Sequence, residues 1–251
     1  MPADLAAFYP TSYYELPHAD ELDDLASSEA HKVEMLSRFV VPGRLVEIGA
    51  GFGVFARAAR NAGFEVTGIE MDRRSVEYLE DVVEVKAIQS SQPEQVLAAL
   101  PPSRAVVMWH SIEHLPRPWD VLRSAAANLE PGGVLAIATP NPDSLQFRLL
   151  GARWAHLDAP RHLFLIPARA LERQAEELGL RRVLIATGDP SGRHWNRFGW
   201  EHALRRHPAR RPSTPATRAL SLLITQVLRP VETLGLNGSA YTSVFIKEPT
   251  G

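Results

Sequence analysis

The segment WHSIEHL, residues 109–115, brings two imidazoles and one carboxylate close together. His110, Glu113 and His114 have the i, i+3, i+4 spacing that would face all three side chains one way on a helical turn. Histidine is the usual general base near neutrality, so His110 or His114 could take a proton from a substrate. The three could instead bind a divalent metal that acidifies a substrate hydroxyl, or Glu113 and His114 could brace a neighbouring loop. We expect a base or a brace here and no bound metal.

A second segment, DAPRHLF at residues 158–164, carries Asp158, Arg161 and His162, and Trp154 and His156 come just before it. We expect this segment to be a loop that leads into a helix. Asp158 and His162 either pin the loop by hydrogen bonds, or His162 is a second candidate for the general base, on a par with His110.

The stretch LVEIGAGFG, residues 45–53, predicts a nucleotide-binding turn between a strand and a helix. Its glycines follow the spacing GxGxG, and Val54 stands where a dinucleotide fingerprint needs its third small residue. Glu47, just upstream, would repel a pyrophosphate and would suit a ligand with an ammonium group. These features argue against a nicotinamide oxidoreductase.

A carboxylate nineteen residues after Gly51 ends the next predicted strand, GIE. Such an acid can accept both hydroxyls of a ribose, so we expect Glu70 to bind one, with Met71 against the adenine face. After the third predicted strand the sequence reads IQSSQ, and Ser90, Gln89 or a backbone carbonyl there could contact the adenine amino group.

These residues need a scaffold of alternating strands and helices. Apolar runs predict strands at residues 44–48, 65–70, 83–88, 104–110, 134–140, 181–187 and 241–247. Amphipathic patterns predict helices at residues 55–63, 73–82, 93–100, 119–133 and 170–180. This alternation indicates a Rossmann-like α/β fold, a doubly wound sheet that is mostly parallel with an antiparallel last strand and has helices on both faces.

Two regions interrupt the alternation and divide the chain into four parts. Residues 1–40 are acidic and predict a helical cap with an aromatic cluster, Tyr9, Tyr13 and Tyr14. Residues 41–187 form the Rossmann-like core, and residues 240–251 the last strand and tail. Residues 188–239 are an insertion far longer than a connection requires, and we expect it to fold over the carboxyl ends of the strands as a lid or acceptor wall.

The insertion is rich in arginine and tryptophan. Arg193, Arg197, Trp195 and Trp200 lie close together in it, which would give a wall with flat apolar faces beside positive charge. A solvated basic surface, which the acidic N-terminal region could attract, is the other interpretation.

Together, EIGAGFG, GIEMD, WHSIEHL and LEPGGVLAIATPN resemble class I S-adenosylmethionine-dependent methyltransferases over residues 42–187. The branch most similar contains small-molecule O-methyltransferases of ubiquinone, polysaccharide and natural-product biosynthesis. The ubiquinone enzymes have Glu where this chain has His110, and in that branch the region of DAPRHLF lines the acceptor pocket. The resemblance implies a set of residues that bind S-adenosylmethionine and its product S-adenosylhomocysteine: Glu47, Gly49, Ala50, Gly51, Gly53, Glu70, Met71, Ser90, Trp109 and His110.

Composition limits the function classes. The chain has 251 residues, 45% of them apolar, no cysteine and a net charge of −2, which excludes disulfides and argues against a general nucleic-acid binder. No signal peptide or membrane span is visible, so we expect a cytoplasmic protein. We predict methyl transfer to a small-molecule acceptor, a hydroxyl of a sugar, glycolipid or natural-product intermediate, and the arginines of the insertion could hold an anionic one. The alternatives are transfer to nitrogen or carbon, or a non-catalytic module that binds S-adenosylmethionine.

Overall fold

A seven-stranded sheet organises the computed structural model, which describes residues 16–205 and 213–249. The strand order is β3-β2-β1-β4-β5-β7-β6, and only β7 runs against its neighbours. The strands are β1 (Arg44–Ile48), β2 (Glu65–Glu70), β3 (Lys86–Gln89), β4 (Ser103–Trp109), β5 (Leu129–Pro140), β6 (Leu180–Ala186) and β7 (Ala240–Lys247). The predicted doubly wound sheet with an antiparallel last strand is confirmed.

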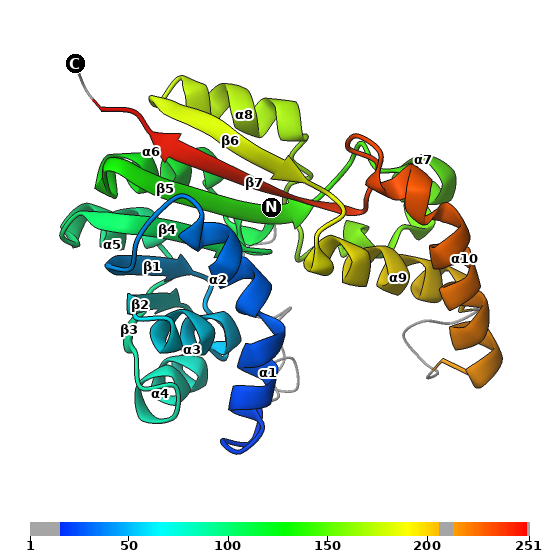
Figure 1. Ribbon diagram of the computed structural model, residues 1–251, viewed down its shortest axis with the longest axis horizontal. Helices are drawn as coiled ribbons and strands as arrows, with labels where there is room; N and C mark the ends of the chain where they lie inside the picture. The colour runs from blue at the N-terminus through cyan, green and yellow to red at the C-terminus, as the bar shows by residue number, and fades with distance from the viewer. Residues whose placement is uncertain (1–15, 206–212, 250–251) are drawn as a thin grey trace.

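Helices cover both faces of the sheet (Figure 1). One face packs against α1 (Leu22–Ser28), α2 (Ala30–Ser37), α3 (Val54–Asn61) and α4 (Arg73–Asp81). The other packs against α5 (Pro93–Ala99), α6 (Pro118–Asn128) and α8 (Ala168–Glu176). Alternate residues of the central strands enter the two cores: Val107 faces the first group of helices and Val106 the second. Because both faces are covered, the strands read as continuous apolar runs.

The helix expected at residues 119–133 is shorter than predicted. It ends at Asn128, and Leu129 is extended and pairs with Ser103, so residues 129–133 belong to β5. Pro131 has no N–H to continue a helix, and Gly132 adopts a left-handed conformation with φ +77°.

The region between β6 and β7 forms two helices, α9 (Pro190–Leu204) and α10 (Pro215–Thr233). β6 and β7 are antiparallel neighbours, with Ala186 opposite Thr242, so a short turn could have joined them. In Figure 1 the parallel strands point to the right, and α7 (Leu145–Leu150), α9 and α10 gather beyond that end of the sheet. The tyrosines expected in the N-terminal cap, Tyr9, Tyr13 and Tyr14, lie outside the described residues.

Gly53 closes the glycine turn and starts α3 with φ +77°. A Cβ built at this position would lie 2.6 Å from Leu79 Cδ2 and 2.8 Å from Val83 Cγ2. The glycine therefore does two things: it adopts the left-handed conformation, and it lets the turn pack directly on the helix after β2.

We expect Gly53→Ala to lower the free energy of unfolding by about 2–4 kcal/mol, the sum of left-handed strain and a core clash. Gly132→Ala is the matched control, since Gly132 has the same φ but nothing within 4 Å of an added Cβ. That control should cost only the strain, about 1–2 kcal/mol. Urea unfolding of both variants measures the difference, and equal losses would show that Leu79 and Val83 impose no constraint.

Candidate active site

The glycine turn and Glu70 form one hydrogen-bonded unit. Glu70 Oε2 accepts the Gly51 N–H at 2.9 Å, and Oε1 accepts the Met71 and Asp72 N–H groups at 2.7 and 3.1 Å. A carboxylate can accept about four hydrogen bonds, and these three N–H groups leave Glu70 one free position for a ligand. If a ribose donated both of its hydroxyls to Glu70, the second hydroxyl would replace the Gly51 N–H. Gly51 has φ +55° and open space where a Cβ would lie, so a ligand can approach its backbone closely.

Glu47 is a buried carboxyl without a hydrogen bond at Oε2 in the described part of the chain. Burial raises the pKa of Glu47 well above its usual range, and the positive charge of Lys32 opposes this rise. A buried carboxyl with an unsatisfied oxygen is costly unless a donor or a cation meets it. A ligand with an ammonium group satisfies that requirement, as the sequence suggested.

Lys32 enters the site from α2, and no sequence motif had indicated it. Its Nζ lies 4.8 Å from the centroid of the Trp109 ring and forms an ion pair with Glu29. Trp109 itself is buried and packs edge-on against Phe55, with ring centroids 5.2 Å apart. Trp109 therefore packs against Lys32 and the core beneath the site, and little of its ring is left exposed to a ligand.

The residues expected to contact the adenine ring are hydrogen-bonded to the end of β2. The Ser90 N–H donates to Glu70 O at 2.9 Å, and Gln89 Nε2 donates to Met71 O at 3.2 Å. The Ser90 hydroxyl oxygen accepts the Gln92 N–H just before α5 begins. Met71 is exposed beside them.

The end of β4 lies against the glycine turn. Ser111 Oγ donates to Ile48 O at 2.6 Å, and a Cβ at Gly49 would lie 2.6 Å from Ser111 Cβ. Ala50, the next residue of the turn, is buried. The residue before Ser111, His110, has φ +53°, an uncommon conformation for a residue with a side chain and one that recurs at functional sites.

Glu113 orients the His110 ring. His110 Nδ1 lies 3.6 Å from Glu113 Oε1, while Thr139 Oγ1 donates to Glu113 Oε2 at 2.9 Å. A carboxylate only accepts hydrogen bonds, so this arrangement favours the tautomer with the proton on Nδ1 and leaves Nε2 as the basic nitrogen. His110 Nε2 is buried and has no hydrogen-bond partner within the described residues. A carboxylate, an imidazole and a vacant basic nitrogen in this order are the parts of an oriented general base.

Glu113 is fully buried yet stays acidic. Burial raises its pKa, but the adjacent His110 imidazole and the nearby His114 and His162 outweigh this effect, so the pKa of Glu113 lies below its usual value. An ionised Glu113 can stabilise a protonated His110.

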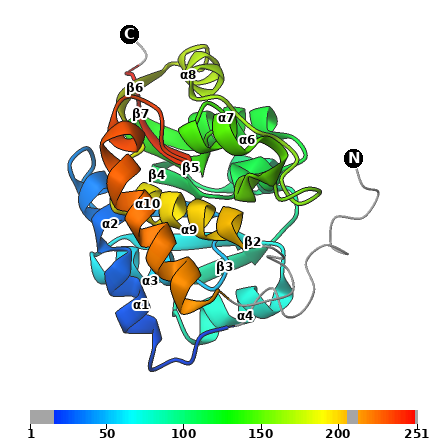
Figure 2. The same ribbon diagram turned by 90° about the vertical axis from the view of Figure 1, so that its right-hand side faces the viewer.

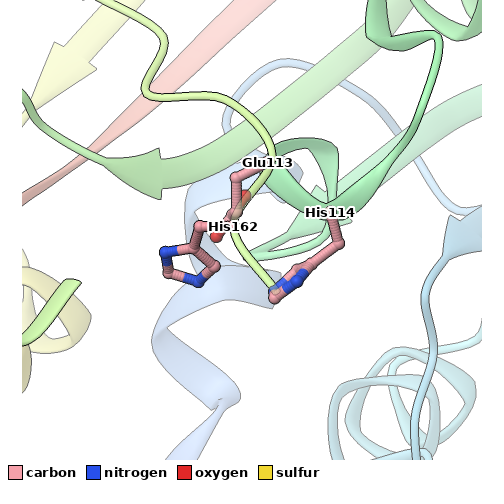
Figure 3. A group of neighbouring side chains, drawn as sticks. All are labelled: Glu113, His114 and His162. Atoms are coloured by element: carbon pink, nitrogen blue, oxygen red, sulfur yellow. The ribbon is translucent and has the colours of Figure 1, made fainter. Parts of the chain in front are cut away.

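The His114 and His162 rings both lie beside the Glu113 carboxylate, as Figure 3 shows. Their rings lie edge to face with centroids 4.7 Å apart. His114 Nδ1 donates to Arg161 O at 3.1 Å and His162 Nδ1 to His156 O at 2.7 Å, because a carbonyl only accepts. Burial lowers the pKa of His114.

The three residues expected to face one way do not do so, because the helical turn covers only Ile112–His114 and is a 3-10 turn. Among the described residues, the group with a metal-compatible arrangement is Glu113, His114 and His162, whose donor atoms lie within 4.8 Å of one another. His110 contacts Glu113 but is not part of that group.

The loop DAPRHLF is fixed from both ends. Arg161 Nη2 donates to Asp158 Oδ1 at 2.6 Å, and His162 Nε2 lies 3.9 Å from Asp158 Oδ2. The Leu163 N–H donates to Glu113 O at 2.8 Å, which joins the loop to the turn after β4. The expectation that Asp158 and His162 pin this loop agrees with these contacts, and the same contacts keep His162 beside the site.

Aromatic rings from the insertion close this end of the sheet. Trp195 of α9 lies 4.8 Å from the His110 ring and 5.2 Å from the His156 ring. His156 is buried, and desolvation lowers its pKa to about 3, so it is neutral. Trp200, by contrast, is turned away into a buried contact in which its Nε1 donates to Glu232 Oε1 at 2.8 Å.

Sequence reasoning missed Thr139 and Lys32. Thr139 ends the strand next to β4, so the rule that parallel strands meet at their carboxyl ends could have placed it beside Glu113. Lys32 carried no comparable signal, since one lysine in a predicted helix is ordinarily a solvated surface residue.

Comparisons with known proteins agree with this geometry. A family model described as a methyltransferase domain matches residues 23–185. The ubiquinone biosynthesis O-methyltransferase of Bordetella pertussis is 32% identical over 127 residues, which cover 47% of this chain and 52% of the relative. That of Aeromonas salmonicida is 29% identical over 163 residues, or 61% of this chain and 66% of the relative. The chain thus spans about half to two thirds of the length of these relatives.

Solved structures share the fold. An S-adenosylmethionine-dependent methyltransferase from Archaeoglobus fulgidus aligns with a TM-score of 0.60 and 18% identity over 88% of this chain and 94% of its own. Phosphoethanolamine N-methyltransferase 2 of Haemonchus contortus, solved with S-adenosylmethionine, aligns with a TM-score of 0.57 and 14% identity over 98% of this chain and 60% of its own. Because the family model matches well over half of the chain, the protein belongs to the methyltransferase domain family.

Proposed function

We propose that this protein transfers a methyl group from S-adenosylmethionine to a hydroxyl of a small molecule. The observation that carries the proposal is His110, which lies against the buried Glu113 beside the glycine turn and whose Nε2 has no hydrogen-bond partner in the described part of the chain. Transfer to oxygen requires that a hydroxyl loses its proton, which is the task an oriented imidazole performs. The family and the names of the relatives, which are O-methyltransferases, support it.

The cofactor would lie along the carboxyl ends of β1, β2 and β4. Glu47 would meet its ammonium group and Lys32 its carboxylate, since Glu47 ends β1 just before the glycine turn and the positive charge of Lys32 acts on it. Glu70 would accept the ribose hydroxyls, with Met71 against the adenine and the backbone near Ser90 facing its amino group. The bound cofactor supplies an electrophilic methyl group on a sulfonium centre.

The chain itself positions the acceptor and removes its proton. His110 Nε2 accepts the proton of the hydroxyl, and the ionised Glu113 stabilises the imidazolium that results. Thr139 holds Glu113 in place. Trp195 lies against His110 and excludes water from that side of the site.

The insertion, residues 188–239, would form the acceptor wall, and residues 1–40 would cap the cofactor side through Lys32. Trp195 and Phe198 on α9 pack against each other with ring centroids 5.7 Å apart, and Arg197 is an exposed cation on the same helix. Arg193, in contrast, donates to Gly188 O at the start of its own helix. Flat apolar faces beside a cation suit an acceptor that carries an anionic group, such as an acidic or phosphorylated sugar, glycolipid or natural-product intermediate.

We expect Glu70→Ala to weaken the binding of S-adenosylhomocysteine by about 1.5–3 kcal/mol, the range for hydrogen bonds to a charged acceptor. Isothermal calorimetry measures the change, and thermal unfolding shows whether the glycine turn survives the loss of its anchor. Glu65→Ala is the control, because Glu65 is an exposed acid at the other end of β2. Unchanged affinity in Glu70→Ala would show that the ribose is held elsewhere.

A screen of hydroxyl acceptors with labelled S-adenosylmethionine tests the reaction, and His110→Ala tests the base. We expect kcat to fall by about 10²–10⁴-fold in this variant, with affinity for the cofactor nearly constant. His194→Ala is the control, since His194 is exposed and also contacts Trp195 but lies away from Glu113.

Two outcomes would contradict His110 as the base. A loss confined to His162→Ala would transfer that role to His162. Full activity in both variants, together with loss in a chelator and recovery with magnesium, would assign deprotonation to a metal at Glu113, His114 and His162. Cofactor binding with no transfer to any acceptor would leave a non-catalytic binding module.

A further inference from the structure

Helix α10 holds a buried carboxyl that connects three helices. None of the helices in the described part of the chain could span a membrane, and α10 packs along α9 at the end of the sheet (Figure 2). Glu232 of α10 is 1% exposed, and its Oε1 accepts hydrogen bonds from Trp200 Nε1 of α9 at 2.8 Å and from Gln146 Nε2 of α7 at 3.2 Å. Gln146 Nε2 also donates to Asn196 O of α9 at 2.7 Å. The helices α7, α9 and α10 therefore meet at one carboxyl group.

Two oxygen atoms in this cluster lack a hydrogen bond among the described residues. They are Glu232 Oε2 and Gln146 Oε1, and both are buried. Turning the Gln146 amide around would not help, because its Nε2 lies beside two oxygens and the Asn196 carbonyl can only accept. A buried oxygen without a donor destabilises the fold, so the cluster needs one more hydrogen-bond donor.

A single proton on Glu232 supplies that donor. A carboxylate only accepts hydrogen bonds, whereas a protonated carboxyl also donates one. A proton on Glu232 Oε2 would be donated to Gln146 Oε1, on the residue whose Nε2 already binds the other oxygen of Glu232. Burial also raises the pKa of Glu232, and the hydrogen bonds from Trp200 and Gln146 that oppose this rise come from uncharged groups. Glu113 differs, because three histidines lie beside it and its pKa is lowered.

We propose that Glu232 is a protonated carboxylic acid in the native protein and that it shares its proton with Gln146. The pair clamps α9 and α10 against α7, where the backbone of Gly199 comes so close that an added Cβ would clash with Gln146 Oε1. Trp195 directly precedes Asn196, so the clamp also positions the indole that lies against the candidate base. This inference does not depend on the proposed methyl transfer.

The proposal makes the stability of the protein depend on pH. The side chains that meet the Glu232 carboxyl, Trp200 and Gln146, do not titrate, and neither does Thr187, which donates to the Glu232 backbone carbonyl at 3.2 Å. A raised pKa in the folded state stabilises the protein below the ordinary pKa of a glutamate, and this contribution is lost as the pH rises through the raised pKa. We therefore expect the wild type to lose free energy of unfolding relative to Glu232→Gln as the pH rises, because an amide keeps a donor and an acceptor but cannot ionise.

Urea unfolding at a series of pH values measures this difference. Glu232→Gln should match the wild type below the ordinary pKa of a glutamate and exceed it in stability at alkaline pH. Glu65→Gln is the matched control, since Glu65 is exposed at the start of β2, and it should follow the wild type at every pH. Trypsin cleavage after Arg193 and Arg197, which flank Trp195 on α9, should be faster at alkaline pH in the wild type than in Glu232→Gln.

Infrared difference spectroscopy detects the proton itself. The spectrum of the wild type minus that of Glu232→Gln should contain the carbonyl stretch of a protonated carboxylic acid at slightly acid pH, where exposed carboxyl groups are ionised. Gln146→Met removes the proposed acceptor and should move this band to higher frequency, and thermal unfolding checks that the variant folds. The proposal is overturned if the band is absent, if Gln146→Met leaves it in place, or if the stability difference between the wild type and Glu232→Gln does not change with pH.

Discussion

The arrangement at the C-terminal ends of the parallel strands depends on one constraint, the fully buried carboxylate of Glu113. Glu113 must be compensated from several directions at once, because an isolated buried charge would cost several kcal/mol. Thr139 from β5 and His110 from the end of β4 contact its oxygens, and its backbone carbonyl accepts the Leu163 N–H. Two neighbouring strands and the loop before α8 are therefore held in one arrangement by a single residue.

That arrangement separates the two halves of the site. On one side Ser111 binds Ile48 O and brings the glycine turn against β4, so the groups suited to a nucleotide, Glu47 and Glu70, stand in a fixed relation to His110. On the other side Trp195 lies against both His110 and His156, so the insertion reaches the same point. His110, the proposed proton acceptor, lies at the junction, where a methyl donor and a hydroxyl would have to meet.

Local patterns sufficed for the core of the fold. The apolar runs indicated all seven described strands, because a sheet covered on both faces requires continuous apolar sequence, although the third begins at Lys86 and not at residue 83. The GxGxG spacing with Glu70 placed the turn beside the acid that holds it. The end of α6 was wrong, because Leu129–Gly133 is drawn into β5 by pairing with another strand, and periodicity along one segment carries no information about that partner.

Contacts between segments that are far apart along the chain could not be predicted from the sequence. Nothing in the helical pattern around Lys32 shows that it lies over Trp109, and the two tryptophans of the insertion look alike until Trp195 is found at His110 and Trp200 at Glu232. The i, i+3, i+4 spacing of His110, Glu113 and His114 assumed an α-helical turn. The left-handed His110 and the 3-10 turn after it send His114 toward His162 instead.

The most direct measurement is a calorimetric titration of the wild-type protein with S-adenosylhomocysteine and, separately, with NAD. Glu47 is a buried carboxyl whose Oε2 has no hydrogen-bond partner among the described residues, and it suits an ammonium group better than a pyrophosphate. Saturable binding of S-adenosylhomocysteine with no heat from NAD is the predicted result. Binding of NAD with equal affinity, or no binding of S-adenosylhomocysteine, would contradict the assignment of this site to a methyl-donor nucleotide.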